Sequence, residues 1–144
     1  MLAGLLCSVA LAFMAPHAGE TSLECISAEE ATEVHGMENP LGWYNGDTDT
    51  AYVIEGLSHT YTQEVIWHEL AHAWDLKKGT ELNGFPSFFS ETHTGFDLES
   101  FARLQTLHLG VWPSGERYPG EIPTEAEWTA MESAGWLMTK EEAR

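Results

Sequence analysis

The stretch of residues 65–75 constrains this chain more than any other, because it contains the motif His68-Glu69-Leu70-Ala71-His72. Residues four apart on an α-helix lie on one face, one turn above each other. The imidazoles of His68 and His72 can therefore point at a single metal ion. Glu69 is rotated by about 100° from His68 around the helix axis, so its carboxylate can reach a water on that metal. The spacing predicts two metal ligands and a general base on one helix.

The residues around this motif predict a helix over residues 61–78, with Thr60 or Thr62 as its N-cap. Apolar side chains at helical spacing form one face, made of Ile66, Leu70, Ala73 and Trp74. The two histidines lie off this apolar stripe, which is the context that a metal-binding helix requires. The alternative is an amphipathic helix that carries two histidines without a metal.

A catalytic zinc site needs a third protein ligand and one open position for water. The downstream candidates are Glu91, His93, Asp97, Glu99 and His108. We favour Glu99, because it lies near the start of a second predicted helix at residues 97–109, where its direction is fixed. Ala102 follows one turn later and leaves room for the first helix to approach. His93 in the preceding loop is the alternative ligand, and an ordinary solvated carboxylate in a first helical turn is the alternative role of Glu99.

The expected chemistry follows from these ligands. Two neutral imidazoles and one carboxylate leave a zinc site with a net positive charge, which lowers the pKa of bound water toward about 7. Glu69 accepts a proton from that water as it attacks a carbonyl, and can pass the proton to the leaving amine. The spacing selects no oxyanion donor among the candidates Tyr118, His93 and His108. Asp75 either orients an imidazole or is simply a polar helix residue.

The motif from His68 to His72, followed by Glu99 in the segment Leu98-Glu99-Ser100-Phe101-Ala102, resembles the gluzincin class of zinc metallopeptidases, particularly its small single-domain members. The likeness covers about residues 41–110. It implies Zn²⁺ held by His68, His72 and Glu99, with Glu69 as general base and a peptide or protein as substrate. The resemblance also implies that the strand Thr50–Glu55 is the sheet edge that pairs with an extended substrate.

Residues 2–15 form an uncharged apolar run. The run is shorter than the roughly 20 residues that span a membrane, and it has the length of a secretory signal. We therefore predict that residues 1–18 are an export signal and that residues 19–144 form a zincin-like metallopeptidase domain, secreted or otherwise extracytoplasmic. A buried N-terminal helix or an uncleaved anchor is the alternative. In that case a Cys7–Cys25 bridge can form in an oxidising compartment, whereas cleavage leaves Cys25 alone.

The charge balance bears on partners. The chain has 23 acidic and 6 basic residues, a formal net charge of −17. Binding to nucleic acid rests largely on lysine and arginine, so no nucleic-acid partner is expected. Docking on anionic lipid is disfavoured for the same reason, and we expect no stable membrane partner. The acidic surface serves solubility or, alternatively, steers cationic substrates.

The remaining segments complete the predicted fold. We expect a short helix at residues 27–34 capped by Ser27, a β-hairpin of residues 41–45 and 50–55, and a third helix that opens at Thr124 with a capping box. Asp47 and Asp49 serve the hairpin turn or, alternatively, bind calcium. The fold class is α+β, a small twisted sheet packed on the motif helix with two or three further helices. We predict a zinc metallopeptidase; the alternatives are a non-catalytic zinc-binding module and a hydrolase of a non-peptide amide.

Overall fold

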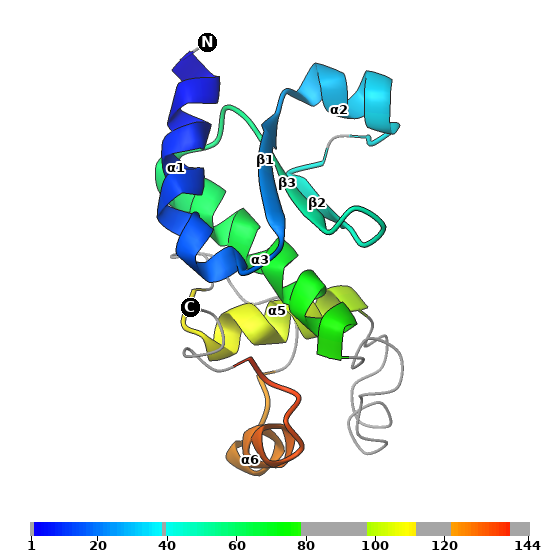
Figure 1. The fold of residues 1–144 in the computed structure, drawn as a ribbon. Coiled ribbons are helices and arrows are strands. Elements are labelled where there is room, and N and C mark those ends of the chain that lie inside the picture. Colours follow the sequence, from blue (N-terminus) through cyan, green and yellow to red (C-terminus); the bar gives the residue numbers. More distant parts are fainter. Residues whose placement is uncertain (1, 39, 79–97, 112–121, 139–144) are drawn as a thin grey trace.

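A computed structural model of the chain describes residues 2–38, 40–78, 98–111 and 122–138. These residues form helices around a three-stranded sheet (Figure 1). In chain order the elements are α1 (Leu2–Ala18), β1 (Ser22–Ile26), α2 (Ala28–His35), β2 (Gly42–Asn45), β3 (Thr50–Ile54), α3 (His59–Lys78), α5 (Leu98–His108) and α6 (Glu125–Ser133). The predicted α+β class is confirmed. Within the described residues α3 has four companion helices, α1, α2, α5 and α6, where we expected two or three.

The sheet is mixed, with the strand order β1-β3-β2. The predicted hairpin is confirmed, because β2 and β3 pair antiparallel with Tyr44 opposite Ala51. β1 was not expected from the sequence, and it pairs parallel to β3 with Cys25 opposite Val53. β3 therefore lies in the centre of the sheet and all of its residues are buried. The expectation that Thr50–Glu55 forms the sheet edge is wrong, because β1 covers the side of β3 that was predicted to be open.

The two faces of the sheet are covered by different helices. Val53 points to one face and joins a buried cluster with Val65, Ile66 and Leu70 of α3. Tyr52 and Ile54 point to the other face, where they pack with Ala31 of α2. This alternation is the two-residue period of a strand that is buried on both sides. It explains how α3 is held firmly against the sheet along its first half.

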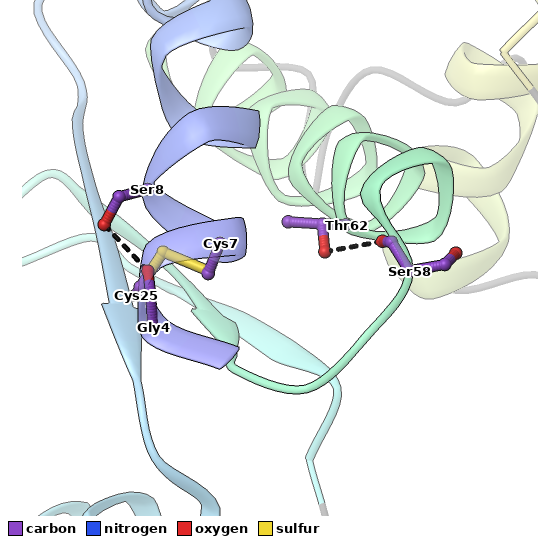
Figure 2. The surroundings of a disulfide bond; sticks show 6 residues. All are labelled: Gly4, Cys7, Ser8, Cys25, Ser58 and Thr62. Atoms are coloured by element: carbon purple, nitrogen blue, oxygen red, sulfur yellow. Dashed lines mark hydrogen bonds between the residues drawn. A yellow bond between two sulfur atoms is a disulfide. The ribbon is translucent and has the colours of Figure 1, made fainter. Parts of the chain in front are cut away.

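Helix α1 packs beside α3 and contributes four buried side chains to the fold, those of Cys7, Ala10, Met14 and Ala18. A disulfide between Cys7 and Cys25 joins α1 to β1 (Figure 2). This is the arrangement expected if the apolar segment is retained, and cleavage after residue 18 stays a prediction. No helix among the described residues has both the length and the apolarity that crossing a membrane requires.

The N-terminus of α3 differs from the prediction by two residues. The helix begins at His59, and the Ser58 hydroxyl accepts a hydrogen bond from the Tyr61 N–H at 3.1 Å. Ser58 is therefore the capping side chain, so the expectation of Thr60 or Thr62 is wrong. Thr62 is buried and donates its hydroxyl to the Ser58 carbonyl at 2.8 Å (Figure 2). The caps of α2 and α6 are as predicted, with Ser27 accepting from the Glu30 N–H and a capping box between Thr124 and Glu127.

The end of α3 is tied to the hairpin turn by a polar cluster around Asp49. Its carboxylate accepts hydrogen bonds from Thr21 and Tyr44 at 2.8 Å each and lies 3.0 Å from the Lys77 ammonium. Burial alone would raise the pKa of Asp49, but these three donors outweigh it and hold the pKa below its usual 3.8. Asp49 thus acts as a turn residue, and it links the sheet to the last turn of α3.

Candidate metal centre

The structure brings His68, His72 and Glu99 together at the point where α5 crosses α3. Nε2 of His68 lies 3.1 Å from Oε2 of Glu99, and Nε2 of His72 lies 2.8 Å from Oε1 of the same carboxylate. The two imidazole rings stand nearly perpendicular, with centroids 4.9 Å apart. Both oxygens of one carboxylate thus face the two histidines that the sequence singled out.

This donor set fits a zinc ion. The three candidate ligand atoms all lie within 4.8 Å of one another. Two ligands of a tetrahedral zinc with bonds of about 2.1 Å lie about 3.4 Å apart, close to the spacing between the carboxylate and each imidazole. Two imidazoles and one carboxylate are a ligand set found at catalytic zinc sites, where a fourth position stays open for water. His68, His72 and Glu99 could therefore hold Zn²⁺.

The close approach of the two helices depends on small side chains next to the ligands. Ala71 lies between the two histidines on α3, and Ala102 lies one turn after Glu99 on α5. Both are fully buried and belong to the same hydrophobic cluster. A larger side chain at either position would separate the helix axes. The expectation that Ala102 leaves room for α3 is confirmed by its packing.

Glu69 lies on α3 beside β2, and only 7% of its surface is exposed. Burial raises the pKa of its carboxyl to about 7, against the opposing effect of the neighbouring histidines. The strand lies close to it at Gly42, where a Cβ would be 3.5 Å from Cγ of Glu69 and 2.7 Å from Cγ1 of Val65. The absence of a side chain at Gly42 thus lets β2 lie directly against α3.

The charges within the cluster support one another. Hydrogen bonds from His68 and His72 hold the pKa of Glu99 well below its usual range. Burial disfavours the charged form of His72, but its hydrogen bond to Glu99 and the negative charge of Glu69 outweigh this and raise its pKa. Nε2 of each imidazole thus faces one oxygen of the Glu99 carboxylate. A metal ion would bind between these nitrogen and oxygen atoms, and it requires both imidazoles to be neutral.

Two other candidate residues, His108 and Asp75, have partners outside the cluster of His68, His72 and Glu99. His108 is in the last turn of α5, about 13 Å along the helix axis from Glu99. There its Nδ1 lies 3.9 Å from Glu132, and its ring stacks at a tilt on Trp128. It is therefore not placed to donate to an oxyanion at the cluster. Asp75 is buried and accepts a hydrogen bond from Gln105 at 2.9 Å, and its charge contributes to the raised pKa of His72.

The remaining candidates lie outside the described residues. These are Glu91, His93 and Asp97 as ligands, Tyr118 and His93 as oxyanion donors, and the predicted loop that carries His93.

Sequence reasoning missed Gln105, whose side chain is fully buried between α3 and α5. The helical spacing in the sequence does indicate this burial, because Gln105 lies on the same face of α5 as Ala102 and Leu109, which are both buried. A polar residue in such a stripe must find internal partners.

Comparisons of the chain with protein-family models, with curated proteins and with solved structures found no match.

Proposed function

We propose that this protein is a zinc-dependent metallopeptidase that hydrolyses peptide bonds, with His68, His72 and Glu99 as zinc ligands and Glu69 as general base. The observation that carries the proposal is the convergence of three ligand atoms from two helices within 4.8 Å. A bound zinc would supply Lewis acidity, which activates water and polarises a carbonyl group.

The residues of the chain have separate roles in this proposal. His68 and His72 present their Nε2 atoms on one face of α3, and Glu99 adds the carboxylate from α5. Glu69 accepts a proton from the attacking water and donates it to the nitrogen of the leaving amine. A purely structural zinc site has no use for a carboxylate next to its first ligand. The intact Glu69 therefore favours hydrolysis over a non-catalytic binding module.

The finer fold and the location are part of the same proposal. We propose a zincin-like domain similar to small gluzincins, in which β2 is the edge strand nearest to Glu69 and an extended substrate adds to it. We also propose that the protein works outside the cytoplasm, since structural disulfides such as Cys7–Cys25 persist in oxidising compartments.

The test compares zinc content and hydrolysis in the wild type, Glu69→Gln and a matched control, Glu29→Gln. Glu29 is exposed on α2, which covers the opposite face of the sheet from α3. We expect one zinc per chain in all three proteins. Hydrolysis of casein should fall by roughly 10³-fold or more in Glu69→Gln alone. Equal hydrolysis by Glu69→Gln and the wild type would refute the mechanism.

A hydrolase of a non-peptide amide would use the same ligands and base. A panel of peptide and non-peptide amides, offered to the zinc-loaded wild type, separates the two substrate classes. We expect cleavage of peptides, and turnover confined to non-peptide amides would contradict the proposed substrate. Stable zinc binding without any turnover would instead favour the binding module.

A further inference from the structure

We propose that Gln105 is a positioning residue for the metal centre, which holds α5 against α3 so that Glu99 reaches His68 and His72. This inference rests on the proposed zinc site and adds a residue that touches neither the metal nor the substrate. It arises from the one fully buried amide side chain among the described residues.

The amide of Gln105 is bonded on both of its sides. Its Nε2 donates to Oδ1 of Asp75 at 2.9 Å and to the Trp136 carbonyl at 2.8 Å. Its Oε1 accepts from the Met138 N–H at 2.7 Å. A glutamine amide has two N–H donors, and both are used here. One side chain of α5 thus connects α3 with the segment that follows α6.

The position of Glu99 depends on such an anchor. Its side chain is 54% exposed and lies in the first turn of α5, so little packing around the carboxylate itself holds it in place. Its location relative to the imidazoles is therefore set by how α5 lies on α3. The hydrophobic contacts near Ala71 and Ala102 bring the helices together, but apolar contacts are not directional and permit sliding.

The hydrogen bond to Asp75 removes that freedom. Gln105 lies about 9 Å along α5 from Glu99, and Asp75 lies about 4.5 Å along α3 from His72. The contact of Glu99 with the histidines and the contact of Gln105 with Asp75 are thus two separate points on the same pair of helices. Together the two contacts fix both the translation and the rotation of α5 relative to α3. A single contact would allow α5 to pivot about it.

Loss of the amide should move α5. Asp75 is only 3% exposed, so an apolar side chain at position 105 would leave its carboxylate buried without this donor. A buried charge that loses a hydrogen-bond partner favours any displacement that admits water. Such a displacement separates Glu99 from the two imidazoles.

The experiment compares Gln105→Met with Thr106→Val as a matched control. Thr106 is also buried on α5, but its hydroxyl bonds to the Arg103 carbonyl of the same helix. Zinc affinity is measured by competition with a chromophoric chelator, and the visible spectrum of the cobalt-substituted protein reports ligand geometry. We expect Gln105→Met to weaken zinc binding by about 10- to 100-fold and to change the cobalt spectrum. Thr106→Val should leave both as in the wild type.

A merely structural role would lower the melting temperature of Gln105→Met and leave the zinc affinity and cobalt spectrum of the folded protein unchanged. That result would overturn the inference. If Gln105→Met does not fold, Gln105→Asn takes its place, because an amide one methylene shorter cannot reach Asp75 and Met138 together. Wild-type protein that binds no zinc would defeat the proposed function, whereas zinc binding that is equal in wild type and variant defeats only the role of Gln105.

Discussion

Oε2 of Glu99 lies 3.1 Å from Nε2 of His68, although the two residues are 31 positions apart in the chain and belong to different helices. The candidate metal centre therefore consists of a local pair on α3 and one distant carboxylate. The distant member is the one whose identity depends on the fold.

Replacement of Glu99 by alanine should strongly weaken zinc binding while the protein stays folded. Its side chain is more than half exposed and contributes little to the core, whereas a zinc site with only two protein ligands is weak. We expect the zinc affinity to fall by at least about 100-fold. Equilibrium dialysis with zinc and far-UV circular dichroism check the two parts. The control is His93→Ala, which should keep the metal; the reverse pattern would move the third ligand to the preceding loop.

Replacement of Gly42 by alanine should destabilise the fold. The new Cβ would lie 2.6 Å from the Tyr52 carbonyl oxygen and 2.7 Å from Cγ1 of Val65, so β2 must move away from α3. We expect the free energy of unfolding to fall by about 1–3 kcal/mol, measured by urea denaturation. Gly46→Ala is the control, because its Cβ meets the flexible end of Leu76 at 2.9 Å. An effect at Gly46 as large as that at Gly42 would contradict this reasoning.

Replacement of Asp49 by asparagine should make the free energy of unfolding less dependent on pH in the acidic range. The pKa of Asp49 is lowered below 3.8 in the folded protein, so its ionised form stabilises the fold above that pH and the contribution is lost as the pH falls through the folded pKa. Asparagine can accept from Thr21 and Tyr44 and adopts the positive φ of 48° found here, but it has no charge for Lys77.

We expect the free energy of unfolding of the wild type to exceed that of Asp49→Asn by about 1 kcal/mol or less near neutral pH. This difference should shrink below about pH 4. Urea denaturation across this pH range gives both values. Asp47→Asn, an identical change on an exposed position of the same turn, serves as the control. A difference that grows toward acid would show that the carboxylate does not act through its charge.

Removal of the disulfide by the double change Cys7→Ala and Cys25→Ala should lower the free energy of unfolding by about 3 kcal/mol under oxidising conditions. The bridge joins residues 18 positions apart. Closing a loop of this length lowers the conformational entropy of the unfolded chain and so stabilises the fold by about this free energy. Zinc affinity should stay within about threefold of the wild type, because the bridge joins α1 and β1 and neither element supplies a ligand.

Mass analysis of the exported wild-type protein under non-reducing conditions tests whether residues 1–18 are retained. A mass that includes α1 and lacks two hydrogens agrees with the bridged form. A mass that corresponds to residues 19–144 would show that the segment is an export signal and that Cys25 is left alone.

Several local features of the fold were predictable because they depend on neighbouring residues. The Ser27 and Thr124 caps each involve a backbone N–H three residues away, and the hairpin is set by the turn between two short strands. The cap of α3 was not predicted, because Ser58, Thr60 and Thr62 are all chemically suitable. Which of the three caps α3 depends on where the chain leaves the sheet after β3 and turns into the helix.

The order of the strands could not be predicted in this way. β1 pairs with β3 in parallel, and parallel partners are joined by a long connection that leaves no local turn signal. Because β1 was not predicted, the sequence indicated only the hairpin of β2 and β3. In that prediction one edge of β3 was unpaired. The burial of every residue of β3 is the consequence that only the assembled sheet shows.

The sequence by itself determined the pair of histidines and the adjacent glutamate, because the helical repeat alone sets their relative directions. It also limited the candidates for a third metal ligand to a few carboxylates and imidazoles. The tertiary structure decided that Glu99 faces both imidazoles, that Gly42 brings β2 against α3, and that Gln105 bonds to Asp75. These contacts depend on side-chain volumes at the helix crossing and on buried polar groups that need partners, and neither is encoded within a single helical turn.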